Sequence, residues 1–230
     1  MKLHRFFLED ALGAATKVVV RLPGFLNQVK NVLRFKVGDT IVIFDNSGFD
    51  YIAIIEDFSN EGVSLSITEK RENKVHPSRE TYLFASVVKK DTFEWIVEKA
   101  TELGVSHIIP VISSRTEKKD VNSERLLKIA TEAAEQSGRG TVPTIHEVAN
   151  LSDTLANYSY LRAVVWEPTA EKFQAKELDE INSMYIGPEG GWTQEELQMF
   201  KDHGIMTRSL GPQILRAETA VVAALSQIVF

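Results

Sequence analysis

The sequence has no cysteine among its 230 residues. This absence excludes disulfides and thiolate zinc sites, and it is compatible with a reducing compartment. Long apolar runs are missing as well, since no stretch approaches the roughly 18 apolar residues that a membrane span needs. The N-terminus, MKLHRFFLEDALG, carries acids within its first ten positions and does not resemble a signal peptide. We therefore expect a soluble cytoplasmic protein with no membrane attachment.

An excess of positive charge is also lacking. Lysine and arginine number 26 against 32 acidic residues, so the formal net charge is −6. This balance argues against a nucleic-acid coat over the whole surface, although a local basic patch is still allowed. The five histidines show neither HxxxH nor HxH spacing, and with no cysteine we predict no metal site. The length suits one large domain or two modest ones.

The first part of the chain is rich in β-branched and aromatic residues, which favours strands. The turn Asp45-Asn46-Ser47-Gly48 separates two of these runs, and Asn60-Glu61-Gly62 precedes a third. The polar run 69–80 contains Pro77 and is typical of a linker. We place a small β-barrel or meander at residues 1–70, a linker at 71–80 and a second domain at 81–230. The expected strands are Thr40–Phe44, Tyr51–Ile55 and Val63–Thr68.

The second part alternates short apolar runs with amphipathic segments. This alternation predicts an α/β domain in which helices cover both faces of a parallel sheet. Asp91 and Glu94 have the spacing of a capping box, and Gly104 is expected to end that helix. The expected strands are Tyr82–Val88, His107–Ile112, Thr144–Val148, Leu161–Trp166, Ser183–Ile186 and Thr207–Leu210, and the expected helices are Asp91–Leu103, Glu124–Ser137, Gln194–His203 and Arg216–Val229.

A glycine turn, MYIGPEGGWTQEEL, joins the strand that ends at Ile186 to a helix that follows Thr193. Glu196 is expected to complete a capping box with Thr193. The glycines therefore lie at the carboxyl end of a parallel strand, where open α/β sheets bind ligands. The turn has no P-loop lysine, and Glu189 would repel a phosphate. We expect a neutral or cationic ligand held by backbone groups, with a plain strand-to-helix turn as the alternative.

A second turn, SLGPQILRAETA at residues 209–220, repeats the design of strand, Gly-Pro and helix. Ile214 and Leu215 would each lose roughly 1.5–3 kcal/mol if left exposed, so they are expected to pack on the core or on a flat apolar ligand such as a purine. Glu218 suits the start of a helix because of the helix dipole. Arg216 is less favoured there, which indicates a substrate or an acid as its partner.

GPEGGWTQEE and LGPQILRAETA together resemble the paired knot motifs of the SPOUT methyltransferases. Within that superfamily the chain is most similar to the ribosomal RNA small subunit methyltransferase E family, and HRFF, VLRFKVGD, KATELGV, SSRTEK and EQSGRGTVP resemble other segments of it. The resemblance implies a PUA-like N-terminal β-barrel and a C-terminal trefoil-knot domain, whereas periodicity alone predicts an ordinary doubly wound sheet. It also implies S-adenosylmethionine-dependent methylation of uridine N3 in 16S rRNA. One departure is Gln213, where the family usually has a basic residue.

The resemblance implies a set of site residues. Arg216 or Arg139 is the candidate for stabilising a uracil anion, and Glu218 or Glu189 is the candidate general base. Both choices stay open. Trp166, with Glu167 at the same strand end, is either a wall of the adenine site or a core aromatic. The expected cofactor-binding residues are Trp166, Glu167, Gly187, Pro188, Glu189, Gly190, Gly191, Leu210, Gly211, Ile214, Leu215 and Arg216.

The stretch from Ala11 to Gly38 holds five cations and no acid, which is either a solvated surface or a patch for an RNA backbone. The resemblance favours RNA. The expected RNA-binding residues are Lys17, Arg21, Lys30, Arg34, Lys36, Lys89 and Arg115.

The last helix is apolar nearly all round and should be buried on most sides. Burial within its own domain would satisfy that pattern, and the resemblance adds a homodimer. The expected partners are 16S rRNA, within the small ribosomal subunit, and a second copy of the chain. The alternatives are an RNA-binding module without catalysis, a related methylase acting on tRNA or on a ribose hydroxyl, and a nucleotide hydrolase, which the missing phosphate loop disfavours.

Overall fold

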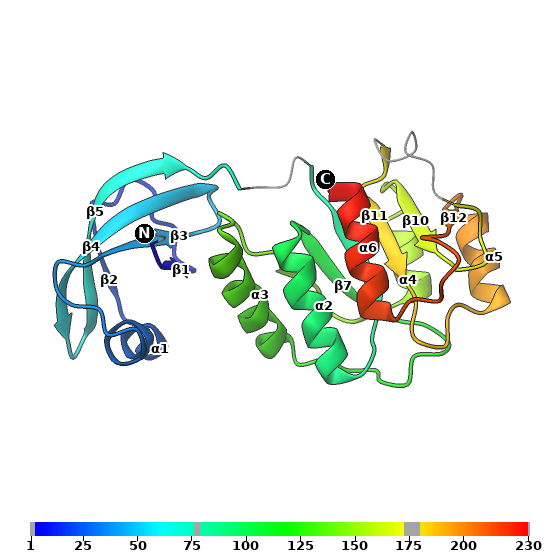
Figure 1. Ribbon diagram of the computed structural model, residues 1–230, viewed down its shortest axis with the longest axis horizontal. Helices are drawn as coiled ribbons and strands as arrows, with labels where there is room; N and C mark the ends of the chain where they lie inside the picture. The colour runs from blue at the N-terminus through cyan, green and yellow to red at the C-terminus, as the bar shows by residue number, and fades with distance from the viewer. Residues whose placement is uncertain (1–2, 76–78, 173–179, 230) are drawn as a thin grey trace. The chain divides into compact units, whose positions relative to one another are not determined.

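A computed structural model describes residues 3–75, 79–172 and 180–229 (Figure 1). The chain forms two compact units. The first holds Met1–His76 and Ala134–Thr141, and the second holds Pro77–Ala133 and Val142–Phe230. Residues 71–75, expected to belong to the linker, belong to the first unit: a strand continues to Glu72, and Asn73 is only 5% exposed. The return of residues 134–141 to that unit has no counterpart in the sequence pattern.

The first unit is built on a five-stranded sheet with the order β1-β3-β4-β5-β2. Strand β1 pairs parallel to β3, and the other pairings are antiparallel. Fully buried side chains such as Ile41, Ile43 and Ile55 make its core. The elements are β1 (Arg5–Phe7), β2 (Lys17–Val20), α1 (Pro23–Leu26), the π-helical turn η1 (Asn27–Val32), β3 (Thr40–Phe44), β4 (Phe49–Ser59) and β5 (Gly62–Glu72).

A buried polar cluster fixes residues 134–141 within the first unit. Arg5 forms a two-pronged ion pair with Asp50, at 2.7 and 2.8 Å, and also donates to the carbonyl of Arg139 at 3.0 Å. The Asn73 amide donates to Asp50 at 2.8 Å and to the Gly138 carbonyl at 3.0 Å. Gly140 packs so closely that an added Cβ would lie 2.8 Å from the Asn73 Cβ. These contacts give the segment EQSGRGTVP a structural role.

The second unit is an α/β layer structure, as expected. Its strands pair in parallel in the order β12-β10-β11-β6-β7-β8, and β9 pairs with β7. The elements are β6 (Tyr82–Ser86), α2 (Lys90–Glu102), β7 (His107–Ile112), α3 (Ser123–Ser137), β8 (Thr144–Ile145), β9 (Ala149–Asn150), α4 (Leu151–Asn157), β10 (Ala163–Trp166), β11 (Ser183–Ile186), α5 (Gln194–Asp202), β12 (Met206–Arg208) and α6 (Ala217–Val229). The last turn of α3, from Ala134 on, belongs to the first unit.

Helices cover both faces of this parallel sheet. Leu155 of α4 and Phe200 of α5 join one buried cluster with Phe84 and Tyr185 of the central strands. Figure 1 shows α2 and α6 side by side, and the two helices are in contact. Because side chains alternate along a strand, the neighbours of Phe84 in β6 face the other way and are also fully buried. Burial on both faces explains why the strands of this unit are continuous apolar runs.

The helix starts test two sequence predictions. The capping box at α5 is confirmed: Thr193 accepts from the Glu196 amide, and the Glu196 side chain accepts from the Thr193 amide. The box predicted at Asp91 is wrong, because α2 begins one residue earlier and its N-cap, Lys89, makes no side-chain cap bond. Gly104 follows that helix with φ at +103°, which suits a glycine that ends a helix.

Candidate functional site

The two glycine turns lie side by side at the carboxyl ends of the parallel strands, called the carboxyl edge below. Strand β10 pairs in parallel with both β11 and β12, so the three strands end on the same side of the sheet. The loops after them enclose a cavity of about 350 Å³. A volume of this size is within the range of small-molecule sites. Every residue expected to bind the cofactor lines this cavity except Arg216; the binding role itself stays a prediction.

The first turn owes its shape to local hydrogen bonding. The Gly191 amide donates to the Pro188 carbonyl at 2.8 Å, which closes a β-turn over Glu189 and Gly190. Gly191 has φ at +68°, a conformation that glycine adopts without steric cost. Trp192 follows and is only 5% exposed, and in the described part of the chain its indole Nε1 has no hydrogen-bond partner. The wall of the cavity therefore holds a buried donor.

The second turn is braced against the loop that follows β10. The Ser209 hydroxyl accepts from the Gly211 amide at 3.1 Å, and two carbonyl acceptors lie within reach of its proton, Gly211 at 2.9 Å and Pro168 at 3.2 Å. Leu215 is half-buried, but Ile214 is 88% exposed. Core packing is therefore the wrong explanation for Ile214 in this chain. The other expected contact, a flat apolar ligand, stays a prediction.

Three charged residues line the cavity: Glu167, Glu189 and Arg115. The Arg115 guanidinium donates to the Gly190 carbonyl at 2.5 Å and also lies 3.4 Å from the Trp192 carbonyl. Its charge faces backbone dipoles, while the two carboxylates give the lining a net negative formal charge. Such a lining disfavours a phosphate and tolerates a positive sulfur centre. Together with the buried indole donor and the glycine backbone, it fits S-adenosylmethionine.

The proposed catalytic residues differ in their placement. Glu189 is exposed and lines the cavity. Arg216 is exposed and directly precedes Ala217, which also lines it, whereas Glu218 is half-buried in the first turn of α6. Arg139 is not among the lining residues. It belongs to the first unit, is 3% exposed, and burial lowers its pKa to about 10.

The residues expected to bind RNA are all exposed. Five of them belong to the first unit. The exposed apolar side chains of Val19, Leu22 and Val32 lie between them in the chain, and that of Val37 directly follows Lys36. The segment therefore presents a mixed basic and apolar surface. Lys89 precedes α2, and Arg115 is engaged with the glycine turn. The RNA-binding role of the set stays a prediction.

Sequence reasoning missed several residues that line the cavity, of which Trp192 is the largest. Its position directly after the glycine pair was the available signal. The other residues that were missed come from the end of β11, from the same loops and from α6: Ile186, Pro168, Thr169, Gln213, Ala217 and Ala220.

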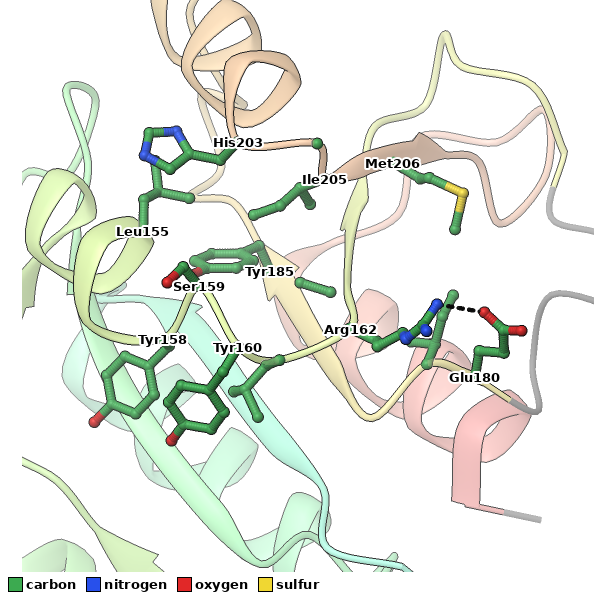
Figure 2. Close-up of a pocket in the computed structure, with 14 residues that line it drawn as sticks. Leu155, Tyr158, Ser159, Tyr160, Arg162, Glu180, Tyr185, His203, Ile205 and Met206 are labelled. Atoms are coloured by element: carbon green, nitrogen blue, oxygen red, sulfur yellow. Dashed lines mark hydrogen bonds and ion pairs between the residues drawn. The ribbon is translucent and has the colours of Figure 1, made fainter.

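A second, larger cavity of about 640 Å³ lies at the opposite, amino ends of the same strands. Figure 2 shows Tyr185 in the middle of its lining, with the Arg162–Glu180 ion pair, 2.5 Å long, at one side. Its lining includes Gly204, which ends α5 with φ at +70°, but neither of the two Gly-Pro turns of the carboxyl edge borders it. Ligands of open α/β sheets bind at the carboxyl ends of strands, so the smaller cavity is the candidate site.

Among residues 3–75, 79–172 and 180–229, no three histidine, aspartate or glutamate side chains gather closely enough to hold a metal ion. Over the same part of the chain, no helix combines the length and the apolar character needed to cross a membrane.

Comparison with known proteins adds independent findings. A family model described as an RNA methyltransferase domain matches residues 75–229, and one described as an RNA methyltransferase PUA domain matches residues 29–68. The chain is 31% identical to ribosomal RNA small subunit methyltransferase E of Rickettsia conorii, over 99% of this chain and 96% of that protein. It is 32% identical to the protein of the same name from Bacillus subtilis, over 88% and 86% of the two chains.

Solved structures agree with these matches. A ribosomal RNA small subunit methyltransferase E from Neisseria gonorrhoeae, bound to S-adenosyl methionine, superposes with a TM-score of 0.90 at 28% identity. The match covers 98% of this chain and 96% of that one. The similarity therefore extends over both units and the edge that carries the two glycine turns.

Proposed function

This chain belongs to the RNA methyltransferase family of the ribosomal RNA small subunit methyltransferase E proteins, and we propose that it methylates N3 of a uridine in 16S rRNA with S-adenosylmethionine as donor. The observation that carries the proposal is the cavity formed where two glycine turns meet, with acids and no lysine in its lining. Neither an RNA-binding module without catalysis nor a nucleotide hydrolase requires such a cavity.

The cavity residues are assigned to donor binding. S-adenosylmethionine supplies a methyl group on a positively charged sulfur. The backbone of the two turns holds the adenosyl part, and the Trp192 ring forms part of the wall. Glu167 and Glu189 favour the positive charge of the donor over a neutral product. Fixed alignment of the reacting atoms supplies much of the rate.

The proton of uracil N3 has to leave, because the anionic ring is the better nucleophile. A carboxylate, Glu189 or Glu218, accepts that proton, and a cation, Arg216 or Arg139, stabilises the anion. The lining position of Glu189 supports it as the first choice. A pH–rate profile for Glu189→Gln and for Glu218→Gln tests the step. If both profiles match the wild type, carboxylate base catalysis is excluded.

We assign RNA binding to the basic segment 11–38 of the first unit, hereafter the basic face, in which Lys17, Arg21, Lys30, Arg34 and Lys36 are all exposed. The substrate is 16S rRNA within the small ribosomal subunit, met in the cytoplasm. Base methylation at N3 requires base-edge access, which a ribose methylase does not need. The position of the methyl group therefore separates this function from the ribose alternative.

The active form is proposed to be a homodimer with a trefoil knot in each second unit. Helix α6 supports the dimer, because Ala220, Val222 and Ala223 along it are only half-buried. The exposed Ile214 beside the cavity supports it too. Light scattering tests this state: a particle near 25.8 kDa is a monomer and contradicts it, and twice that mass agrees.

The deciding experiment uses purified protein, labelled S-adenosylmethionine and small ribosomal subunits from cells that lack the gene. Methylation at N3 blocks the Watson–Crick edge, so a primer-extension stop at one uridine, with the matching nucleoside by mass spectrometry, supports the function. Label in a ribose hydroxyl or in tRNA instead supports the related methylases. Binding of RNA with no calorimetric response to the donor supports a module without catalysis.

A further inference from the structure

The loop after β7 carries the motif Ser113-Ser114-Arg115-Thr116, which the proposed function leaves unexplained. Its two ends are locked together: the Ser113 amide donates to the Thr116 hydroxyl at 3.0 Å, and the Thr116 amide donates to the Ser113 carbonyl at 3.0 Å. The Ser113 hydroxyl also lies 3.4 Å from that of Ser86, at the end of the neighbouring strand β6. The loop is therefore a fixed support on two central strands.

Glu196 connects this support to the first glycine turn. The side chain is 3% exposed, and one oxygen accepts from the Ser114 amide at 2.7 Å. The other oxygen accepts from the Thr193 amide at 2.8 Å. Two backbone donors and the start of helix α5 compensate for burying this charge. A residue that would otherwise only cap a helix thus bridges two loops.

Arg115 makes the second connection between the loop and the turn, at Gly190, three positions before Thr193 in the chain. Its Nη1 donates to the Gly190 carbonyl at 2.5 Å and lies 3.4 Å from the Trp192 carbonyl. The aliphatic stem covers Gly190, where an added Cβ would lie 3.2 Å from the Arg115 Cδ and 3.3 Å from its Cβ. Glycine is thus required at 190 partly because the arginine lies over it.

We propose that Arg115 and Glu196 form a latch that positions the cofactor-binding turn, and that Arg115 is a positioning residue for methyl transfer rather than an RNA contact. Strand β6 lies between β7 and β11 in the sheet, so the latch joins loops that do not follow neighbouring strands. The latch keeps the carbonyls of Gly190 and Trp192 pointing toward the Arg115 guanidinium. This inference rests on the proposed function, because it assigns the turn to the methyl donor.

The test compares Arg115→Ala with Lys118→Ala. Lys118 is an exposed cation of the same loop, so both variants lose one positive charge from the same place. Loss of the charged hydrogen bonds in Arg115→Ala should raise the calorimetric dissociation constant for S-adenosylmethionine about tenfold. Lys118→Ala should bind the donor as the wild type does. In steady-state assays the KM for the donor should rise in Arg115→Ala while the KM for the RNA stays constant.

Two further variants separate positioning from charge and from folding. Arg115→Lys keeps the charge but lacks the planar guanidinium whose Nη1 contacts both carbonyls, so it should recover donor affinity only in part. Glu196→Gln replaces one acceptor by a donor and should weaken donor binding likewise, with thermal unfolding as the check that the variant is folded. Full recovery by Arg115→Lys, or wild-type donor affinity in Arg115→Ala, overturns the latch. Failure of the wild-type protein to bind the donor overturns the proposed function instead.

Discussion

Gly187 lies directly against the indole ring of Trp192. A Cβ added at Gly187 would lie 3.1 Å from Cε2 and 3.2 Å from Nε1 of that ring. The end of β11 and the wall of the cavity are therefore in close contact, and a side chain at 187 fits only if the indole shifts.

The first prediction follows from this contact. Gly187→Ala forces the indole to shift, so we expect weaker binding of S-adenosylmethionine and a loss of about 1–2 kcal/mol of unfolding free energy from overpacking. Titration calorimetry and urea unfolding measure the two effects. Gly24→Ala is the matched control, since a Cβ there meets no atom within 4 Å. Donor affinity in Gly187→Ala equal to that of the wild type contradicts the role of the contact.

The second prediction concerns the acids of the cavity. S-adenosylmethionine and S-adenosylhomocysteine share their adenosyl part, but only the former carries a positive sulfur. Glu189→Gln should therefore reduce the preference for S-adenosylmethionine over S-adenosylhomocysteine, measured as the ratio of their affinities, by about twofold to fivefold for a partly solvated charge pair. Glu132→Gln changes an exposed acid of α3 and should leave the ratio unchanged. An unchanged ratio in Glu189→Gln means that this carboxylate does not face the sulfur.

The third prediction concerns the polar cluster of the first unit. Burial would raise the pKa of Asp50, but hydrogen bonds from Arg5 and Asn73 and the charges of Arg5 and Arg71 hold the pKa below its usual value. Because the pKa is depressed, the ionised Asp50 carboxylate stabilises the folded chain fully above the pKa of the unfolded chain, near 3.9. This stabilisation is lost as the pH falls through the lower pKa of the folded chain. Asp50→Asn should therefore lose about 3 kcal/mol at pH 7.

That difference in unfolding free energy should narrow below about pH 4. Urea unfolding at pH 7, 5 and 3.5 measures it. Asp57→Asn, on an exposed position of the same strand, should show no comparable loss. A difference between wild type and Asp50→Asn that is equal at all three pH values contradicts the assignment.

The fourth prediction uses His146. Burial, together with the charge of His107, lowers its pKa; the His107 Nδ1 lies 3.0 Å from the His146 Nε2. Below the unfolded pKa of about 6.5 the unfolded chain binds a proton at His146 that the folded chain resists, so the free energy of unfolding decreases as the pH is lowered. His146→Gln should make the decrease in unfolding free energy between pH 7.5 and pH 5.5 smaller. His4→Gln, at an exposed position, should keep the wild-type slope.

The fifth prediction tests the basic face. Replacing Lys17 and Lys30 by alanine should weaken RNA binding and reduce the slope of log K against log salt by about 0.7 for each lost phosphate contact on single-stranded RNA. A double variant at Lys128 and Lys201, two exposed lysines of the second unit, loses the same charge. Equal changes in both double variants indicate a general charge effect and contradict a localised RNA face.

The strands of the second unit were predictable because burial on both faces makes them continuous apolar runs. Tyr82–Ser86 and Ser183–Ile186 lie within the expected ranges. The expected strand Thr144–Val148 was only partly right, since β8 ends at Ile145 and a second short strand begins at Ala149. Helix α4, of seven residues, was missed. Strand order was beyond reach, because it depends on pairings between residues far apart in the chain.

The site was predictable where a motif is local. Both glycine turns and the Thr193 cap depend on neighbouring residues, and the structure brings the two turns together at one cavity. Arg115 was not predictable in the same way. Its sequence position marks an exposed cation after a strand, and only the tertiary contact with Gly190 reveals that the guanidinium faces backbone carbonyls.

The return of residues 134–141 to the first unit has a consequence for how that unit is made. During synthesis, Arg5 and Asn73 leave the ribosome long before the carbonyls of Arg139 and Gly138 that they bind. The Phe7 amide is likewise synthesised long before the Glu135 carboxylate, to which it donates at 2.9 Å. A fragment that ends at residue 76 lacks all three acceptors, so a single proteolytic cut after residue 76 does not release this unit intact.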